Sequence, residues 1–367
     1  MLDLYNRMEV KYEGEPCYDI VLKDSYKDLI EEIDALEIKN RKICIVTDSN
    51  VALYYLKQLE EICEDHVGKV VSFVFPAGED NKNLETVQNL YEYLIRESFD
   101  RKDVLLALGG GVVGDLTGYT AATYLRGIRF LQVPTSLLAM VDSSIGGKTG
   151  VDFKAYKNMV GAFYMPSCVY MNLECLKSLE ERIFLSGMGE IIKHGLIQDK
   201  AYYEWLKENR DAIIAKDFTV LRNMVGRSCE IKRAVVEIDP HELKERAWLN
   251  FGHTIGHAVE KWMDFTLLHG ECVAIGMVAA SYLSYERGYL TKEEHEDIVS
   301  TIEAFKLPIR VQKLETADIL EALSRDKKMD AGQIKFILLR RIGEAVIDTT
   351  ITREELIRAI ELIMKER

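Results

Sequence analysis

The sequence predicts an α/β domain built on a parallel sheet, followed by a mostly α-helical domain. Two observations lead to this fold class. Up to about residue 170, short β-rich runs alternate with helical runs, which is the pattern of parallel strands joined by helical crossovers. Beyond about residue 178 the strand signals nearly stop and long amphipathic runs take over. We therefore expect two domains, at residues 1–178 and 179–367.

Strand and helix signals alternate regularly in the first domain. Strands are predicted at KICIVTD (42–48), KVVSFVFP (69–76) and DVLLALGG (103–110). Helices are predicted between them at VALYYLKQLEEICEDH (51–66) and NLETVQNLYEYLIRES (83–98), the second capped by Asn83. Strands joined in this way pair in parallel with right-handed crossovers, so ligands of the sheet are expected beyond the carboxyl ends of its strands.

The second domain is predicted from its amphipathic periodicity. The helical runs cover residues 180–197, 200–215, 217–238, 252–263, 270–287, 291–305, 315–326 and 353–366. One exception is IKFILLRRIGEAVIDT (334–349), whose two β-rich runs around Ile342 and Gly343 predict a small hairpin.

The composition is typical of a folded globular protein. The chain has 367 residues, 48% of them apolar, and a net charge of −13 that is spread along its length, which argues against a nucleic-acid or membrane partner. The seven cysteines are scattered and form no C-x-x-C pair, so we expect them to be reduced. The first residues lack an apolar signal segment and no run of about 18 apolar residues follows, so we expect a cytoplasmic protein.

A glycine-rich turn after the third predicted strand indicates a dinucleotide-binding core. LALGGGVVGD (106–115) contains G-x-G-x-x-G from Gly109 to Gly114, where backbone N–H groups can approach a phosphate at the start of a helix. The motif follows the third strand rather than the first, and no acidic residue stands about 20 positions later, so a tight turn is the alternative. Asp48 and AGEDNK (77–82) end the other two strands at the same edge, which favours a dinucleotide site. For Asp48 alone, a helix cap is the alternative.

A second glycine-rich stretch places a lysine among small residues. It is VPTSLLAMVDSSIGGKTGVD (133–152), in which Lys148 is flanked by glycines, with Lys157 and Asn158 close behind. A nucleotide-triphosphate loop would require glycine where Asp142 stands, so that class of site is disfavoured. We expect Lys148 to meet a phosphate or carboxylate, with a flexible surface loop as the alternative.

Four residues are candidate metal ligands: Glu190, His253, His257 and His269. The two histidines of NFGHTIGH (250–257) are spaced as in a zincin helix, but Thr254 stands in place of the catalytic glutamate and removes the protease interpretation. One carboxylate and two imidazoles would leave open positions on a catalytic zinc ion. The spacing does not choose three ligands out of the four, and a hydrogen-bonded interior position is the alternative for each histidine.

Taken in order, these segments resemble the 3-dehydroquinate synthases, a family of sugar-phosphate cyclases related in fold to glycerol dehydrogenases. The resemblance runs from about Asp48 to Gly343. Its landmarks are GGGVVGDLTGYTAATYLRGI (109–128), QVPTSLLAMVDSSIGGKTGV (132–151), KNMVGAFYMP (157–166), GMGEIIKHG (187–195), LNFGHTIGHAVE (249–260), LHGECVAIGM (268–277) and RDKK (325–328). Two small departures are Ala77, where the family more often has aspartate, and His194, where it more often has tyrosine.

The resemblance implies three groups of site residues. The family's metal ligands correspond to Glu190, His253 and His269, and the histidine that faces the substrate corresponds to His257. The NAD contacts correspond to Asp48, Asn50, Glu79, Lys82, Gly111, Val112, Val113, Gly114, Asp115, Thr135, Ser136, Asp142, Lys148, Lys157, Leu176, Lys177 and Ser178. The substrate pocket corresponds to Arg126, Lys148, Asn158, Lys193, Lys232, Arg246, Asn250 and Lys327, with Lys328 as the alternative to Lys327.

The resemblance also implies an activity and its cofactors. The expected enzyme is a phosphate-eliminating carbon–oxygen lyase of the shikimate pathway to aromatic amino acids, which converts 3-deoxy-D-arabino-heptulosonate 7-phosphate to 3-dehydroquinate. NAD would act as a catalytic hydride carrier and Zn²⁺ or Co²⁺ as a Lewis acid, in a homodimer that binds a small sugar phosphate.

Three alternatives stand beside this activity. They are another sugar-phosphate cyclase, a glycerol-dehydrogenase-like oxidoreductase, and an inactive NAD-binding scaffold. The intact VDSSIGGKTG and RGI patterns argue against another sugar-phosphate cyclase. The many cations argue against the oxidoreductase. The complete set of candidate ligands and pocket lysines argues against the inactive scaffold.

Overall fold

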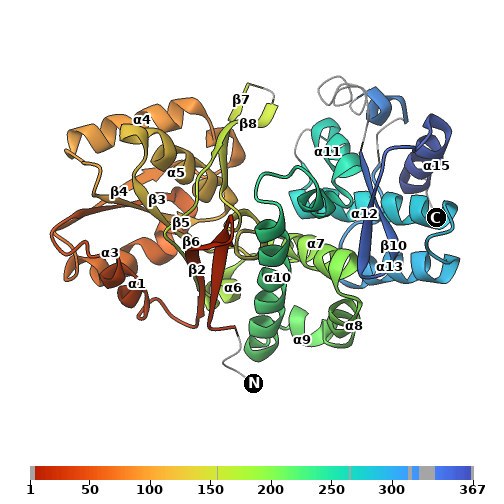
Figure 1. The fold of residues 1–367 in the computed structure, drawn as a ribbon, viewed down its shortest axis with the longest axis horizontal. Helices are drawn as coiled ribbons and strands as arrows, with labels where there is room; N and C mark the ends of the chain where they lie inside the picture. The colour runs from red at the N-terminus through yellow and green to blue at the C-terminus, as the bar shows by residue number, and fades with distance from the viewer. Residues whose placement is uncertain (1–4, 155, 264–265, 313–315, 322–334, 365–367) are drawn as a thin grey trace. The chain divides into compact units, whose positions relative to one another are not determined.

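The computed structural model describes residues 5–154, 156–263, 266–312, 316–321 and 335–364. Contacts between residues divide the chain into two units (Figure 1). The first unit comprises Met1–Leu179 with Leu221–Pro240, and the second comprises Glu180–Val220 with His241–Arg367. None of the described helices combines the length and the apolar character needed to cross a membrane.

A seven-stranded sheet forms the centre of the first unit, in the order β1-β2-β9-β6-β5-β3-β4. Its strands are β1 (Arg7–Tyr12), β2 (Glu15–Lys23), β3 (Lys42–Asp48), β4 (Lys69–Phe75), β5 (Val104–Gly109), β6 (Arg129–Pro134) and β9 (Cys168–Asn172). Only the β1–β2 pair of this sheet is antiparallel. Every residue of β5 is buried, as expected for a parallel strand covered on both faces. The three strands predicted from the sequence are confirmed.

Helices cover both faces of this sheet (Figure 1). They are α1 (Leu29–Ala35), α2 (Ser49–Val51), α3 (Lys57–Glu64), α4 (Leu84–Arg96), α5 (Gly111–Thr123) and α6 (Cys175–Ser178), with π turns η1 (Ala52–Leu56) and η4 (Ala139–Ser143) and 3₁₀ turns η2 (Glu79–Asn81) and η3 (Tyr124–Arg126). Helices α4 and α5 lie on one side of the sheet and α1 and α3 on the other. The predicted cap is confirmed, since Asn83 Oδ1 accepts a hydrogen bond of 2.9 Å from Thr86 N.

Two antiparallel hairpins of the first unit were absent from the sequence prediction. One is the β1–β2 pair, and the other pairs β7 (Lys148–Phe153) with β8 (Tyr156–Phe163). None of the eight residues of β8 is buried, so this strand lacks the apolar core face from which strands are recognised in a sequence. The structure therefore places Lys148 at the start of a strand rather than in a flexible loop.

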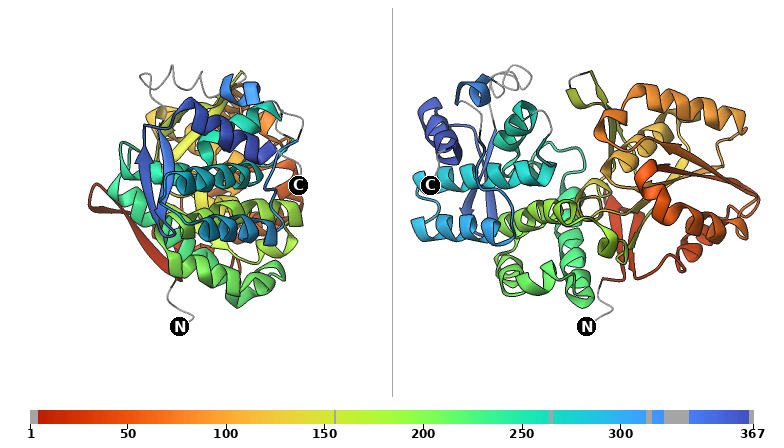
Figure 2. Two further views of the ribbon diagram at one scale, coloured as in Figure 1. Left: turned by 90° about the vertical axis from the view of Figure 1, so that its right-hand side faces the viewer. Right: turned by 180° about the vertical axis from the view of Figure 1, so that it is seen from behind.

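The second unit is mostly helical, as predicted (Figure 2). Its elements are α7 (Glu181–Gln198), α8 (Lys200–Glu208), α9 (Arg210–Ile214), η5 (Glu245–Asn250), α11 (His253–Trp262), α12 (His269–Glu286), α13 (Lys292–Ala304), β10 (Phe336–Arg341), β11 (Glu344–Asp348) and α15 (Arg353–Met364). The antiparallel β10–β11 pair confirms the predicted hairpin. Helix α12 is buried along most of its length and contacts α7, α11, α13 and α15, so the core of this unit is built around it. Of the predicted helix at 315–326, residues 316–321 are described and helical.

Most of helix α10 (Phe218–Ile238) lies in a different unit from the one that the sequence predicted. The sequence prediction assigned it to the second domain, whereas its residues from Leu221 onward belong to the first unit. Specific hydrogen bonds explain this assignment, because Arg222 Nη1 donates to Asn6 Oδ1 at 2.7 Å and Arg233 Nη1 donates to Glu9 O at 2.9 Å. The amphipathic pattern predicted the helix but carried no information about its packing partner.

Candidate functional site

A carboxylate and two imidazoles converge within the second unit. Glu190 lies in the middle of α7, whereas His253 and His269 are the first residues of α11 and α12. His253 Nε2 lies 3.5 Å and His269 Nε2 lies 3.3 Å from Glu190 Oε1. Glu190 and His253 are buried, and His269 is partly exposed. The structure therefore brings together three of the four candidate ligands around one carboxylate oxygen.

The geometry of these three residues fits a divalent cation. Ligand atoms about 2.0 to 2.1 Å from a tetrahedral Zn²⁺ lie about 3.3 Å from one another, which matches both measured separations. Glu190 Oε1 is buried and forms no hydrogen bond with any of the described residues. His253 Nδ1 lies 3.2 Å from Phe251 O, which can only accept a hydrogen bond, so Nε2 is the nitrogen with a free lone pair. A cation would satisfy the buried oxygen and both Nε2 atoms.

The charge states of the cluster also suit a metal site. Burial raises the pKa of Glu190, but the charge of Lys193 and the contacts with His253 and His269 outweigh this effect, and the net pKa lies well below the usual range. Burial lowers the pKa of His253 well below its usual value, so this ring is neutral. Burial also lowers the pKa of His269, but the carboxylates beside it outweigh this effect and raise the pKa to about 10. A bound cation would take the place of the His269 proton.

Two glycines allow α7, α11 and α12 to bring these ligands together. A Cβ atom at Gly270 would lie 1.8 Å from Ser186 O of α7, so only glycine permits this approach of α12 to α7. Gly252 has a φ of +80° and directly precedes α11. This left-handed conformation is readily adopted by glycine, and it sets the point at which α11 begins with His253.

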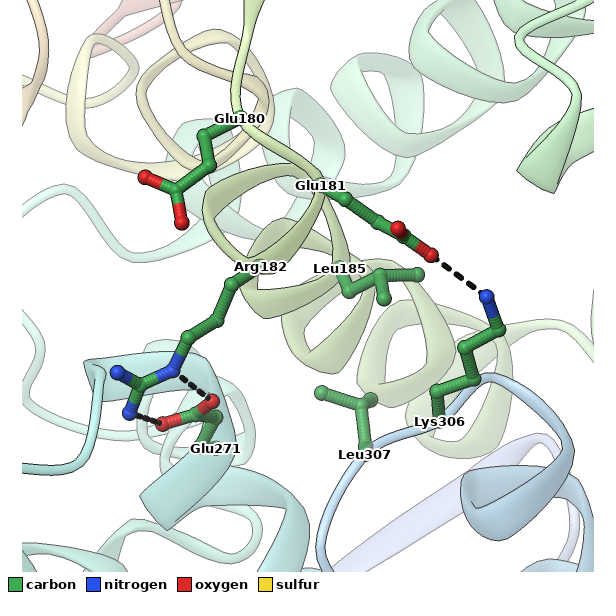
Figure 3. Close-up of a pocket in the computed structure, with 7 residues that line it drawn as sticks. All are labelled: Glu180, Glu181, Arg182, Leu185, Glu271, Lys306 and Leu307. Atoms are coloured by element: carbon green, nitrogen blue, oxygen red, sulfur yellow. Dashed lines mark hydrogen bonds and ion pairs between the residues drawn. The ribbon is translucent and has the colours of Figure 1, made fainter.

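Arg182 holds the start of α12 in place. Its Nε and Nη2 atoms each donate a 2.7 Å hydrogen bond to the carboxylate of Glu271 (Figure 3). Glu271 in turn accepts a 2.7 Å hydrogen bond from Leu268 N, as in a capping box. His269 lies between Leu268 and Glu271 in the sequence. The Arg182–Glu271 pair therefore fixes the turn that carries a candidate ligand.

The same two residues line a small pocket near the start of α7 (Figure 3). Its lining consists of Glu180, Glu181, Arg182, Leu185, Glu271, Lys306 and Leu307. Both cations of this lining are held by carboxylates, Arg182 by Glu271 and Lys306 by Glu181. The pocket therefore offers no free positive charge to an anionic ligand.

His257 faces a different carboxylate from His253. Its side chain is 53% exposed, and Nδ1 lies 3.3 Å from Oε2 of the buried Glu260. His269 Nδ1 lies 3.9 Å from the same oxygen. His257 is therefore associated with Glu260 and His269 rather than with Glu190, and these three residues form a second group that could hold a metal ion.

The remaining predicted residues of the second unit lie on α7 and η5. Lys193 forms a buried ion pair with Glu190 one turn away. Asn250 Nδ2 donates a 2.8 Å hydrogen bond to Glu242 Oε1. Arg246 is almost completely buried. Lys327 and its alternative Lys328 lie outside the described residues.

Most of the predicted NAD contacts follow the carboxyl ends of parallel strands in the first unit. They are Asp48 and Asn50 at the end of β3, Glu79 and Lys82 after β4, Gly111 to Asp115 after β5, Thr135 and Ser136 after β6, and Leu176 to Ser178 after β9. These five strands are parallel, so the segments lie at one edge of the sheet, where ligands of such sheets bind. Asp48 also acts as a helix cap, because its Oδ1 accepts hydrogen bonds from Asn50 N and Val51 N at 2.8 and 3.0 Å.

A buried lysine joins predicted NAD and substrate residues in the first unit. Lys82 Nζ donates to Asp115 Oδ2 at 2.7 Å and to Asn158 Oδ1 at 2.6 Å. Burial lowers the pKa of Lys82, but the charges of Asp115 and Glu79 outweigh it and raise the pKa above its usual value. With its oxygen held by an ammonium group, Asn158 has its amide N–H₂ left as a donor for another partner.

The other predicted residues of the first unit lie on turns and on the β7–β8 hairpin. Lys232 of α10 binds Asp142 of η4 through both the backbone and the side-chain oxygen. Lys157 lies 3.9 Å from Glu79. Lys148 is exposed at the start of β7, and Arg126 is exposed in η3 with a left-handed φ of +67°.

Comparison with known proteins identifies the family. A model of the 3-dehydroquinate synthase N-terminal region matches residues 72–186, and one of the C-terminal region matches residues 187–329. A 3-dehydroquinate synthase from Acetivibrio thermocellus is 43% identical over 94% of this chain and 95% of its own length. The chain belongs to the 3-dehydroquinate synthase family.

Solved structures agree with this family's fold. A 2-epi-5-epi-valiolone synthase from Streptomyces hygroscopicus subsp. jinggangensis, with NAD⁺ and Zn²⁺ bound, is 28% identical with a TM-score of 0.88, over 97% of this chain and 99% of that one. A 2-deoxy-scyllo-inosose synthase with carbaglucose-6-phosphate, NAD⁺ and Co²⁺ has a TM-score of 0.87 at 23% identity, over 98% of this chain and 100% of that one. The α/β fold followed by helices is thus that of the sugar-phosphate cyclases.

Several residues of the site were missing from the sequence prediction. Glu260 lies three residues after His257, and this spacing on one helical face was a signal that could have found it. No motif assigned a role to three other residues, which are Arg182, Glu242 and Glu271. Each of them contacts another residue of the site. Their roles emerge only from the three-dimensional structure.

Proposed function

We propose that this chain is a 3-dehydroquinate synthase, which converts 3-deoxy-D-arabino-heptulosonate 7-phosphate to 3-dehydroquinate and phosphate. The observation that carries this proposal is the convergence of Glu190, His253 and His269 in a member of this enzyme family. The reaction is a step of the shikimate pathway towards aromatic amino acids. Because a C–O bond to phosphate is broken by elimination, the enzyme would be a carbon–oxygen lyase.

The cofactors we infer are NAD and a divalent cation. Glu190, His253 and His269 would hold Zn²⁺, the ion bound in the valiolone synthase structure, or Co²⁺, which accepts the same kinds of ligand. When bound, the cation polarises a substrate hydroxyl as a Lewis acid, and NAD accepts and returns a hydride. Such a transient oxidation acidifies the neighbouring C–H bond and allows phosphate to leave by β-elimination.

Proton transfer is the role we assign to His257. Its half-exposed ring has Nδ1 directed at Glu260, which leaves Nε2 for a substrate. The proton removed during elimination would pass to this nitrogen or to a phosphate oxygen of the substrate. His257 thereby differs from the three metal-binding residues in both surroundings and task.

Cationic and amide side chains would hold the phosphate and carboxylate of the substrate. We assign this role to Arg126, Lys148, Asn158, Lys193, Lys232, Arg246 and Asn250, together with Lys327 outside the described residues. Lysine and arginine suit anionic oxygens, and the amides supply directional hydrogen bonds. These contacts would also orient the ring-opened product for the final intramolecular aldol closure.

Dinucleotide binding is assigned to the segments that follow β3, β4, β5, β6 and β9. The start of α5 at Gly111 would receive the pyrophosphate, because its backbone N–H groups and helix dipole favour an anion. Asp48 would bind ribose hydroxyls through Oδ2, since Oδ1 caps the following helix. Asp142, Lys148 and Lys157 complete the assigned set.

The proposed domain boundaries, oligomeric state and localisation of the protein rest on its sequence and on the family resemblance. We propose an NAD-binding domain at 1–178 and a metal- and substrate-binding domain at 179–367, with residues 221–240 packing on the first. We also propose a homodimer in the cytoplasm. Analytical ultracentrifugation of the purified protein tests the dimer.

The function is tested by incubating zinc-loaded protein with the heptulosonate phosphate and a trace of NAD⁺. We expect equimolar release of phosphate and formation of 3-dehydroquinate, without net accumulation of NADH. If phosphate is released only from other sugar phosphates, the chain is a different sugar-phosphate cyclase. Net NADH formation would instead identify an oxidoreductase of the glycerol-dehydrogenase kind.

A further inference from the structure

Each of the three clustered histidines directs Nδ1 towards an oxygen atom. Nδ1 of His253 lies 3.2 Å from Phe251 O. Nδ1 of His257 lies 3.3 Å, and Nδ1 of His269 lies 3.9 Å, from Oε2 of Glu260. One carboxylate oxygen therefore faces two histidines to which the proposed function gives different tasks.

These oxygens decide which nitrogen of each ring carries the proton. A backbone carbonyl and an ionised carboxylate accept hydrogen bonds and cannot donate them. The tautomer that is protonated on Nδ1 is therefore the more stable one in each ring, and it leaves the lone pair on Nε2. In His253 and His269, Nε2 is the nitrogen that lies beside Glu190 Oε1. The selected tautomer is the one that a cation at this oxygen requires.

Glu260 is well placed for this task. It lies on α11 three residues after His257 and seven after His253, so the three side chains share one helical face. Its side chain is only 7% exposed, and a buried carboxylate requires polar partners. No step of the proposed reaction uses it directly.

We propose that Glu260 is a positioning residue shared by the metal site and the proton-transfer site. Its charge attracts Nδ1–H of His269 across 3.9 Å, so that Nε2 is ready for the cation, and it accepts a hydrogen bond from Nδ1–H of His257 at 3.3 Å, so that Nε2 is ready for the substrate. This inference rests on the proposed function for the two tasks that it connects. Loss of the carboxylate should therefore weaken metal binding and slow turnover through separate routes.

The decisive variant is Glu260→Gln, which keeps the size of the side chain and removes its charge. Its amide group also presents N–H donors, which favour the wrong histidine tautomer. We expect zinc to bind about 10- to 100-fold more weakly, the usual effect of removing a partner of a metal-binding histidine. The affinity is measured on metal-free protein by competition with a chromogenic chelator, without substrate. Glu260→Asp keeps the charge at a greater distance and should recover part of the affinity.

A second measurement isolates the route through His257. At saturating zinc, Glu260→Gln should show a lower kcat with an unchanged KM for the sugar phosphate, because substrate contacts remain while proton transfer is impaired. Glu293→Gln is the matched control, since Glu293 is an exposed glutamate on α13. It should retain the wild-type melting temperature, zinc affinity and kcat.

Three outcomes would overturn the inference. One is a wild-type zinc affinity in Glu260→Gln, with zinc still lost in His253→Ala. A second is a fall in affinity only in proportion to a fall in melting temperature, which would give Glu260 a merely structural role. The third is binding of two zinc ions by the wild-type protein and of one by His257→Ala, which would make Glu260 a ligand. If His253→Ala keeps its zinc, the proposed metal site itself is wrong, whatever Glu260 does.

Discussion

Gly270 brings α12 against α7, and its replacement by alanine tests whether this approach holds the proposed metal ligands together. A Cβ atom at this position would lie 1.8 Å from Ser186 O and 2.7 Å from the carbonyl carbon of Ser186. Both atoms belong to the backbone, so no change of rotamer relieves the overlap. The helices must separate locally by about 1.2 Å, the difference between this contact and the 3.0 Å below which Cβ contacts are essentially never found.

The free energy of this separation can be estimated from opposing effects. Overpacking destabilises a protein by about 1 to 3 kcal/mol, and a backbone–backbone overlap belongs at the upper end of this range. Alanine has a higher helix propensity than glycine, which offsets at most about 1 kcal/mol. A net loss of about 2 kcal/mol lowers Tm by roughly 4 to 8 °C for a unit of this size. His269 adjoins Gly270, so its distance from Glu190 also increases, and zinc affinity should fall.

The assay combines thermal unfolding of the metal-free protein, followed by circular dichroism, with zinc competition at 25 °C. The control is Gly288→Ala, because Gly288 has a φ of +71° with no atom within 4 Å of the added Cβ. The control should lose about 1 kcal/mol through backbone strain alone and keep its zinc affinity. Wild-type Tm and zinc affinity in Gly270→Ala would refute the link between this helix contact and the metal site.

Two further experiments test the residue assignments, one in each unit. His253→Ala and His269→Ala should lose bound zinc on dialysis, whereas His257→Ala should retain it and turn over slowly; equal zinc loss in all three, measured by atomic absorption, would contradict the division of roles. Lys82→Met should destabilise the protein by about 2 kcal/mol, because it leaves the partly buried carboxylate of Asp115 without its ammonium partner. The same variant should bind NAD⁺ more weakly in a fluorescence titration, and unchanged binding would remove Lys82 from the dinucleotide site.

The sequence predicted those elements whose pattern is local. The parallel strands β3 and β5 are buried apolar runs, β4 is a β-rich run that is mostly only partly buried, and the β10–β11 hairpin is two β-rich runs about a glycine. Strand β8 was missed because it has no buried face, and residues 221–240 were assigned to the wrong partner because an amphipathic face does not specify what it packs against. Periodicity thus predicts an element, and long-range contacts decide its place.

The candidate site shows the same division between local and long-range information. Spacing alone proposed four metal ligands and could not select three of them, because Glu190 lies 63 positions before His253 and no periodicity connects them. The family resemblance selected Glu190, His253 and His269, and in the structure the two histidines approach one buried oxygen of Glu190. No sequence pattern assigned a role to Glu260, which faces His257 and His269. None assigned a role to Arg182, which binds Glu271 beside His269, and only the three-dimensional structure shows these contacts.

The two histidines of NFGHTIGH lie on one helical face but have different surroundings. His253 and His257 are four residues apart and their ring centroids are 5.2 Å apart, but the rings are nearly perpendicular, at 84°. His253 begins α11 and directs Nδ1 back to Phe251 O, whereas His257 lies one turn later and directs Nδ1 forward to Glu260. The two Nδ1 atoms therefore have different partners, and Nε2 of His253 lies beside Glu190 Oε1. The acceptors around a histidine pair, rather than its spacing, therefore decide whether both rings bind one metal ion.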